Sequence, residues 1–266
     1  MIAVMGSIDT SVGRIGIATA GGGEAIPILF LHGVGSDKSV WRPQLDHFSK
    51  ACRAVAIDYP GYGDSEPRDG ATRDDFARAA LAVLDALGIA RAHICGLSLG
   101  GVVALALHAL APERCASLIL ADSFAVHPDG QAIYQRGVDA SLAGSMRALA
   151  EARAPSLLGA AARGDPSLVA EIVDTMGRID PTAYRQGAAA VWLADQRERA
   201  AGVAVPTLVI VGSEDTITPP ALSEALARMI NGARLVEIPD TGHLANIESP
   251  AEFNRAVASF LTEIDA

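Results

Sequence analysis

The chain of 266 residues is half hydrophobic and one-fifth charged, a composition that supplies a packed core and excludes a disordered protein. Its length suits one large α/β unit with an insertion, and its formal net charge of -10, spread along the chain, disfavours binding to nucleic-acid phosphates. We therefore expect small-molecule partners.

The cysteines and the apolar runs set the expected compartment. Cys52, Cys95 and Cys115 fall at no metal-ligand spacing, and an odd number of cysteines does not make a disulfide framework. The start of the chain lacks a basic segment followed by an apolar stretch, and the most apolar helix-like run, 101–111, is far shorter than the roughly 20 residues that cross a bilayer. We expect a cytoplasmic protein with reduced cysteines and no membrane partner; these patterns do not predict its oligomeric state.

Short β-type runs alternate with longer helical patterns in the first half, which predicts a mostly parallel sheet built from strand–helix–strand units. Residues 7–17 alternate around Gly13 and suit an antiparallel hairpin at the sheet edge. Strands are then expected at 28–31, 54–57, 93–95 and 118–120, with helices at 40–50, 72–87 and 98–110.

The alternation stops after about Val126. Residues 128–199 are rich in alanine and helical in pattern, with breaks expected at Pro155, Gly164-Asp-Pro166 and Asp180-Pro181. Alternation then resumes, with strands at 207–211 and 234–238 and helices at 221–230 and 250–262. The expected organisation is a core of residues 1–126 and 200–266 with a helical cap inserted at 127–199.

The strongest chemical signal is Gly96-Leu-Ser-Leu-Gly100, which lies between a predicted strand and a predicted helix. This is the setting of a nucleophile elbow, where the small flanking residues allow a tight turn and the helix N-terminus faces developing negative charge. The same pentapeptide can also arise by chance in a loop. Its placement favours Ser98 as a nucleophile.

A serine hydroxyl needs a histidine base and a carboxylate that orients the base. His127 and His243 are the candidates by chain order, and His243, just past the last strand, suits a site at the carboxyl edge of the sheet. Asp215 follows the strand at 207–211 and is the preferred carboxylate. Glu214 and Asp122, which follows the strand at 118–120, are its rivals.

The reaction also needs two donors for the oxyanion. One is the backbone N–H of Leu99, next after the nucleophile, and the second is expected from Val34 in the loop Leu31-His-Gly-Val-Gly35, which could equally be a plain glycine turn. We expect His32 to brace this loop and a structural role for the other histidines, His47, His93 and His108.

No motif for a cofactor or a metal stands out. The glycine-containing strings at 21–23 and 61–65 lack the dinucleotide fingerprint, and the sequence contains no phosphate loop, His-Glu-x-x-His or paired Cys-x-x-Cys. The expected chemistry is covalent and needs neither cofactor nor metal.

With these residues in order, the chain resembles the α/β-hydrolase family from end to end. The resemblance rests on the His32-Gly33 loop, Asp58-Tyr-Pro-Gly-Tyr-Gly-Asp-Ser65, the Ser98 elbow, Asp215 and His243. It implies the α/β-hydrolase fold, a mostly parallel central sheet flanked by helices with an inserted helical cap. Within the family, segments 96–101, 184–195 and 206–215 are similar to 3-oxoadipate enol-lactonases and small carboxylesterases.

The resemblance implies a serine hydrolase that cleaves an ester or lactone of a small acyl substrate through an acyl-enzyme on Ser98. An enol-lactone substrate carries a carboxylate and would favour a cationic partner, for which Arg136 is a candidate; Trp192 and Phe124 are further candidates for substrate binding. Alternatives are an enol-lactonase specifically, a thioesterase, a C–C hydrolase, an acyl-transferring or perhydrolysing enzyme, and a hydrolase-fold binding protein with little turnover.

Overall fold

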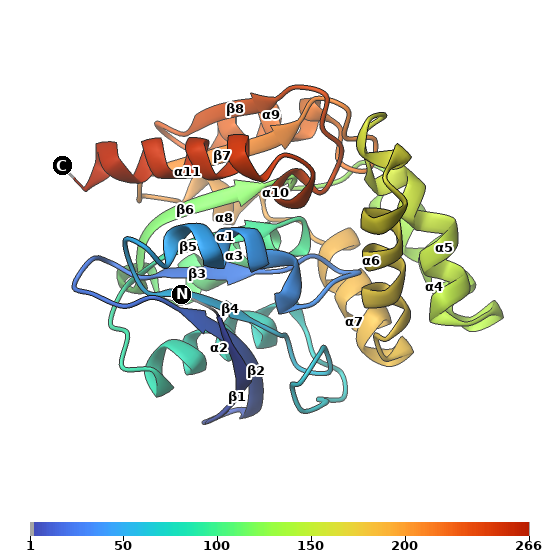
Figure 1. The fold of residues 1–266 in the computed structure, drawn as a ribbon, viewed down its shortest axis with the longest axis horizontal. Helices are drawn as coiled ribbons and strands as arrows, with labels where there is room; N and C mark the ends of the chain where they lie inside the picture. Colours follow the sequence, from blue (N-terminus) through green and yellow to red (C-terminus); the bar gives the residue numbers. More distant parts are fainter. Residues whose placement is uncertain (1–2, 266) are drawn as a thin grey trace.

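The centre of the molecule is one eight-stranded sheet, seen in a computed structural model that describes residues 3–265 (Figure 1). The strand order is β1-β2-β4-β3-β5-β6-β7-β8. The antiparallel pairs are β1–β2 and β2–β4, and every other neighbouring pair is parallel. The strands are β1 (Val4–Thr10), β2 (Gly13–Ala20), β3 (Ile28–Leu31), β4 (Ala54–Ile57), β5 (Ala92–Leu97), β6 (Cys115–Ala121), β7 (Thr207–Gly212) and β8 (Arg234–Ile238).

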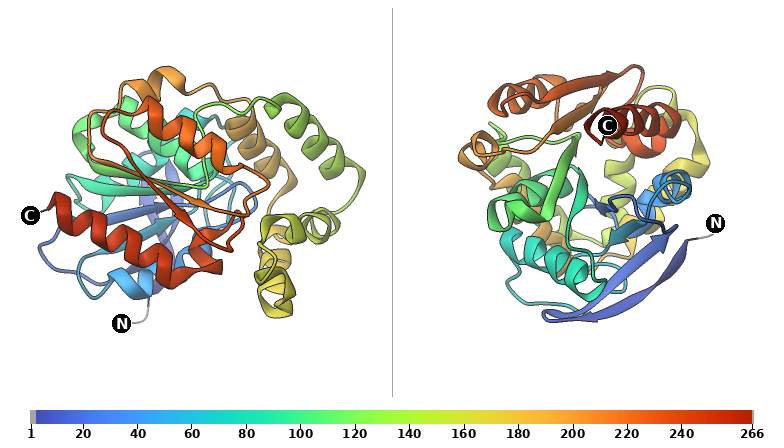
Figure 2. Two further views of the ribbon diagram at one scale, coloured as in Figure 1. Left: turned by 90° about the horizontal axis from the view of Figure 1, so that it is seen from above. Right: turned by 90° about the vertical axis from the view of Figure 1, so that its left-hand side faces the viewer.

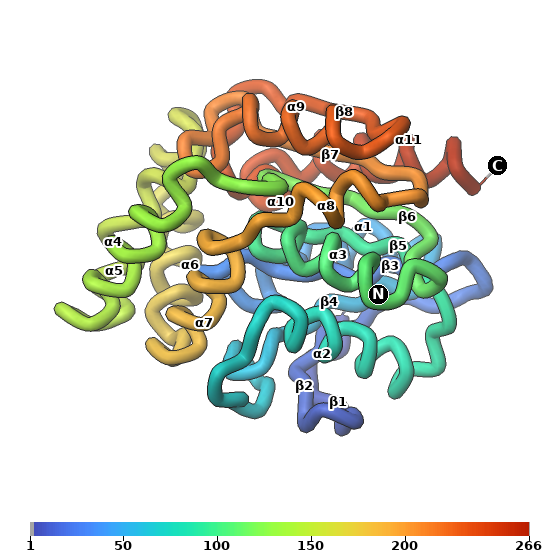
Figure 3. The backbone as a smooth tube through the Cα atoms, turned by 180° about the vertical axis from the view of Figure 1, so that it is seen from behind, coloured from blue at the N-terminus to red at the C-terminus, as the bar shows by residue number. Residues whose placement is uncertain are grey.

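Helices cover both faces of this sheet. One face carries α1 (Arg42–Phe48), α10 (Ala245–Glu248) and α11 (Pro250–Ile264); the other carries α2 (Arg73–Ala86), α3 (Leu99–Leu110), α8 (Arg197–Ala201) and α9 (Pro220–Met229) (Figures 1 and 3). Strands β3 to β7 are buried along their whole length, which explains why their sequences are mainly hydrophobic rather than alternating. The expected mostly parallel, helix-flanked sheet is confirmed.

The edge hairpin is also confirmed. β1 pairs with β2 from Val4 opposite Thr19 to Thr10 opposite Gly13, and Gly13 has a φ of 110°, which a residue with a side chain rarely adopts. The expected helix at 40–50 differs: the structure has a 3-10 turn, η1 (Lys38–Trp41), followed by α1. Pro43, at the start of α1, suits a helix N-terminus because it has no N–H to donate.

Four helices between β6 and β7 lie beside the carboxyl ends of the strands (Figure 2). These inserted helices are α4 (Gly130–Ala143), α5 (Met146–Leu157), α6 (Pro166–Gly177) and α7 (Pro181–Trp192). Asp165 and Asp180 cap α6 and α7 by accepting backbone N–H groups, so the two expected Asp-Pro breaks are confirmed. The next helix, α8, contacts α3 and α9 of the sheet layer.

The expected break at Pro155 is wrong, because α5 continues through it to Leu157. Proline removes one helical hydrogen bond, but here only two residues of α5 follow it, so little helix remains to be disrupted. Leu157 is buried, and its carbonyl accepts the backbone N–H of His243 at 2.9 Å. This contact with the sheet layer holds the last turn of α5 in place.

The three cysteines are free thiols and all are buried. Burial raises the pKa of each: that of Cys115 to about 12, and that of Cys95 well above its ordinary value. Within residues 3–265, no helix has the length and apolar character needed to cross a membrane.

Candidate active site

Ser98 stands on a strained turn between β5 and α3. Its φ is 54° and its ψ is -112°, a conformation rare for a residue with a side chain. Its N–H donates to the Ala121 carbonyl at 2.8 Å, and its own carbonyl accepts the Ser123 hydroxyl at 2.9 Å. A Cβ added at Gly100 would overlap the Leu31 carbonyl, so the glycine allows α3 to approach β3 closely. The turn is the expected elbow.

The Ser98 hydroxyl, the His243 ring and the Asp215 carboxylate form one hydrogen-bonded line. His243 Nε2 lies 3.0 Å from Ser98 Oγ, and His243 Nδ1 lies 2.8 Å from Asp215 Oδ2. All three residues are buried, with exposed fractions of 4% or less. The nucleophile, base and carboxylate expected from sequence are therefore brought together from the ends of three different strands.

Asp215 is held by more than the histidine. Its Oδ1 accepts the N–H groups of Ile217 and Thr218 at 2.8 and 2.9 Å, and its Oδ2 accepts the Thr218 hydroxyl at 2.6 Å. Burial by itself would raise the pKa of Asp215. The charge and hydrogen bond of His243, with the Thr218 donors, outweigh burial and keep that pKa below its ordinary value. The carboxylate thus stays ionised beside the ring.

The rival carboxylates lie elsewhere. Asp122 accepts the N–H groups of Gly212 and Ala245 at 2.9 and 3.3 Å, and burial together with the charge of Asp215 raises its pKa well above the ordinary value. Glu214 accepts the N–H of Ala160 at 2.5 Å. His127, the other candidate base, packs edge-on against Trp192, with ring centroids 5.5 Å apart. Neither the rival acids nor the rival base is hydrogen-bonded to Ser98 or His243.

The Val34 amide is oriented by its neighbours. His32 Nδ1 donates to the carbonyl of Gly33 at 2.8 Å, while His32 Nε2 accepts the N–H of Tyr59 at 3.3 Å. That carbonyl belongs to the same planar peptide as the Val34 N–H, so His32 fixes the direction of this donor. Val34 borders the same pocket as Ser98, and Leu99 is the first residue of α3, where an N–H has no helical partner.

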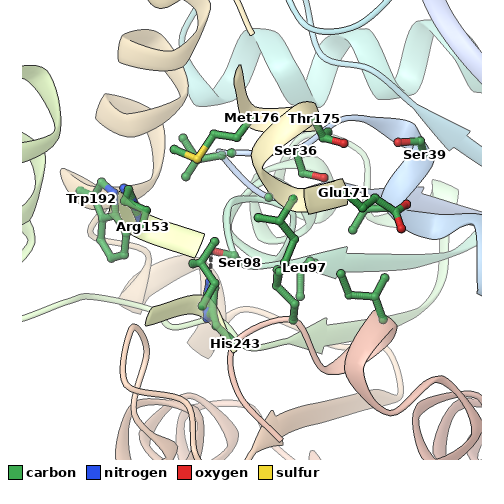
Figure 4. Close-up of a pocket in the computed structure, with 18 residues that line it drawn as sticks. Ser36, Ser39, Leu97, Ser98, Arg153, Glu171, Thr175, Met176, Trp192 and His243 are labelled. Atoms are coloured by element: carbon green, nitrogen blue, oxygen red, sulfur yellow. Dashed lines mark hydrogen bonds between the residues drawn. The ribbon is translucent and has the colours of Figure 1, made fainter. Parts of the chain in front are cut away.

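A small pocket opens beside Ser98 under the inserted helices (Figure 4). The cavity volume is about 60 Å³, compared with the roughly 10–15 Å³ that a single water requires. Arg153 and Trp192 lie at one side of the pocket and Glu171 at the other (Figure 4). Arg153 is half-buried, whereas Glu171 is exposed and also borders an outer hollow, which places Glu171 at the mouth.

The substrate-binding expectations are partly corrected. Trp192 lines the pocket, and Phe124 is buried behind it with ring centroids 5.7 Å apart. Arg136 does not line the pocket, because its position on α4 leaves it exposed. The arginine that does is Arg153, one helix later and one turn before Leu157. The sequence contains no signal for choosing between them, because the packing of α4 and α5 in the folded chain decides which of their residues face the pocket.

No group of three metal-ligating side chains occurs within the described residues 3–265. Several protein groups with chemical potential border the pocket. They include the hydrogen-bonded Ser98 hydroxyl and His243 imidazole, the Arg153 guanidinium, and apolar side chains such as Trp192.

Comparisons with known proteins agree with the observed fold. The model of the Alpha/beta hydrolase family matches residues 28–256. The 3-oxoadipate enol-lactonase 1 of Acinetobacter baylyi is 29% identical over 89% of both chains, and the 2-hydroxymuconate semialdehyde hydrolase of a Pseudomonas species is 34% identical over 92% of this chain and 89% of its own. The crystal structure of the enol-lactonase from Burkholderia xenovorans superimposes with a TM-score of 0.91 and 32% identity over 97% of this chain and all of that one.

Proposed function

The chain belongs to the α/β-hydrolase family, and we propose that it is a serine hydrolase that cleaves the ester or lactone bond of a small acyl substrate. The observation that carries the proposal is the hydrogen-bonded line from Ser98 through His243 to Asp215. Such a line converts a weakly nucleophilic hydroxyl into a group that attacks a carbonyl at neutral pH.

In the first half of the proposed cycle, Ser98 Oγ attacks the carbonyl carbon while His243 Nε2 takes the hydroxyl proton. The negative charge that forms on the carbonyl oxygen is held by the Val34 and Leu99 amides, and Asp215 stabilises the imidazolium. When the tetrahedral intermediate collapses, the C–O bond breaks and the imidazolium gives its proton to the leaving alcohol. The acyl group stays on Ser98.

In the second half, water attacks the acyl carbon while His243 removes one of its protons. The same two amides hold the second oxyanion, and His243 returns the proton to Ser98 Oγ as the acid leaves. We further propose that the inserted helices α4–α7 act as a cap. The small volume beneath them supports a short acyl group rather than a long lipid chain.

The test compares Ser98→Ala with Ser259→Ala, an exposed serine on α11, on p-nitrophenyl acetate, butyrate and laurate. We expect Ser98→Ala to lose ester turnover by at least about 10³-fold together with fluorophosphonate labelling. Ser259→Ala should behave as wild type, and wild type should favour the short esters. Hydrolysis unchanged by Ser98→Ala would contradict the proposal, and turnover absent from wild type would favour a binding protein.

Arg153 favours a narrower second candidate, a lactonase or esterase whose substrate carries a carboxylate. Its guanidinium borders the pocket and donates to the Tyr184 hydroxyl at 2.8 Å. Among residues 3–265, no carboxylate oxygen lies within 4.0 Å of its nitrogens, so its charge has no internal partner. A half-buried, unpaired guanidinium is suited to bind a substrate carboxylate.

This candidate is tested with two esters of equal size, a methyl ester and the matching half-ester with a free carboxylate. We expect Arg153→Gln to raise KM for the carboxylated ester about tenfold, since one charge-assisted pair is lost, and to change KM for the neutral ester little. Arg136→Gln, on the exposed face of α4, is the control. Equal effects of Arg153→Gln on both esters would exclude carboxylate recognition at this residue.

A further inference from the structure

The loop that carries His243 is held at four consecutive backbone N–H groups. Gly242 donates to Glu248 Oε2 at 3.1 Å, and Leu244 donates to Glu248 Oε1 at 3.2 Å. Ala245 donates to Asp122. The N–H of His243 itself donates to Leu157, the last residue of α5, at 2.9 Å. The backbone position of the histidine therefore depends on one of the inserted helices.

Two further hydrogen bonds join the residues after α5 to the same region. The N–H of Gly159 donates to Glu248 Oε2 at 2.7 Å, the oxygen that also accepts from Gly242. The N–H of Ala160 donates to Glu214, the neighbour of Asp215. We call residues 157–160 with Glu214, Gly242, His243 and Glu248 the clasp. It joins one inserted segment to the loops of both the acid and the base.

The two backbones approach so closely that the clasp requires glycine. A Cβ added at Gly159 would lie 2.9 Å from Glu214 Oε2, 3.0 Å from the Gly242 nitrogen and 3.1 Å from the Asp240 carbonyl oxygen. Two of these three neighbours are backbone atoms, which cannot rotate away as a side chain can. A Cβ at Gly242 would in turn overlap the Gly159 nitrogen and the backbone of Leu158.

We propose that Glu248 is a positioning residue, which fixes His243 relative to Ser98 by binding the base loop and the inserted segment with one carboxylate. The inference rests on the proposed function, because it takes His243 as the base. Glu248 acts on both sides of the histidine and does not touch the substrate pocket. Since α5 also presents Arg153 and Leu157 to the pocket, one of the helices that border the pocket also holds the loop of the base.

The test measures kcat and KM for a short p-nitrophenyl ester, with thermal melting, in Glu248→Gln and Gly159→Ala. A glutamine amide can accept at only one of the two oxygen positions, and an alanine Cβ would push the two backbones apart. A displacement of about 1 Å at a catalytic group can cost about 10²-fold, so we expect kcat to fall about 10- to 100-fold in each variant with KM changed less than about threefold. The double variant should lose less than the product of the single losses, because both changes open one clasp.

Matched controls come from positions four or five residues away in the chain, outside the clasp. Gly164→Ala adds a Cβ with no neighbour within 4 Å, and Glu252→Gln removes an exposed carboxylate from α11; both should keep the wild-type kcat. If the clasp only stabilises the fold, the two substitutions would lower the melting temperature and leave kcat of the folded enzyme unchanged. That result would overturn the proposal. If wild type has no ester turnover, the proposed function fails first. If wild type is active and both clasp variants keep its kcat, only the clasp inference fails.

Discussion

Asp122 and Asp215 follow neighbouring strands of the sheet, yet only one of them reaches the histidine. Asp215 accepts from His243 Nδ1, whereas both oxygens of Asp122 are occupied by backbone N–H groups from the ends of β7 and the His243 loop. The two carboxyls also differ in the direction of their pKa shifts, because only Asp215 gains a cationic and hydrogen-bonding partner that outweighs burial.

Asparagine at each of these two positions separates the roles. We expect Asp215→Asn to lower kcat by about 10⁴-fold, since an amide cannot stabilise the imidazolium and favours the wrong tautomer of the ring. Asp122→Asn should stay within about tenfold of the wild-type kcat. It should instead lower the melting temperature, because an amide NH₂ would face a backbone donor in a buried place. Rates of p-nitrophenyl acetate hydrolysis check both, and the reverse order of effects would make Asp122 the catalytic acid.

At the scale of single elements, the hydrophobic pattern of the sequence predicts best the strands that are fully buried. The runs at 28–31 and 54–57 coincide with the fully buried β3 and β4, because short hydrophobic runs bounded by turns have few alternatives. The run at 234–238 also coincides with a strand, β8, although that strand is largely exposed. Asp165 and Asp180 likewise mark helix starts through a local hydrogen bond that the sequence displays. The candidate triad followed from the same logic, since each member ends or follows a strand.

What the pattern could not predict depends on contacts between distant segments. Pro155 does not end α5, because the last turn is held by the His243 loop nearly ninety positions later in the chain, a contact invisible to a local pattern. The choice of Arg153 over Arg136 depends on how α5 packs against its neighbours α6 and α4. Nothing in the sequence distinguishes Glu248 from other acidic residues, and only the fold brings three backbone donors to it.

For the whole molecule, the reactivity of the three cysteines measures how well the core excludes solvent and reagents. Cys52, Cys95 and Cys115 are free, buried and shifted to higher pKa, and the thiolate is the form that reacts. We expect a disulfide reagent at pH 8 to label none of them within minutes in the native protein, and all three in concentrated urea. Rapid labelling of any cysteine in the native protein would contradict the packing described for its strand or turn.

The proposed mechanism requires an acyl group to be carried on Ser98, and such a covalent intermediate can be detected by its added mass. Wild-type protein is mixed with p-nitrophenyl butyrate, quenched in acid within the first turnovers and analysed by intact mass and peptide mapping. The proposed mechanism predicts one added butyryl group, about 70 Da, on the peptide that contains Ser98, and none in Ser98→Ala. Full turnover with no adduct on that peptide, or with the adduct on another residue, would contradict it.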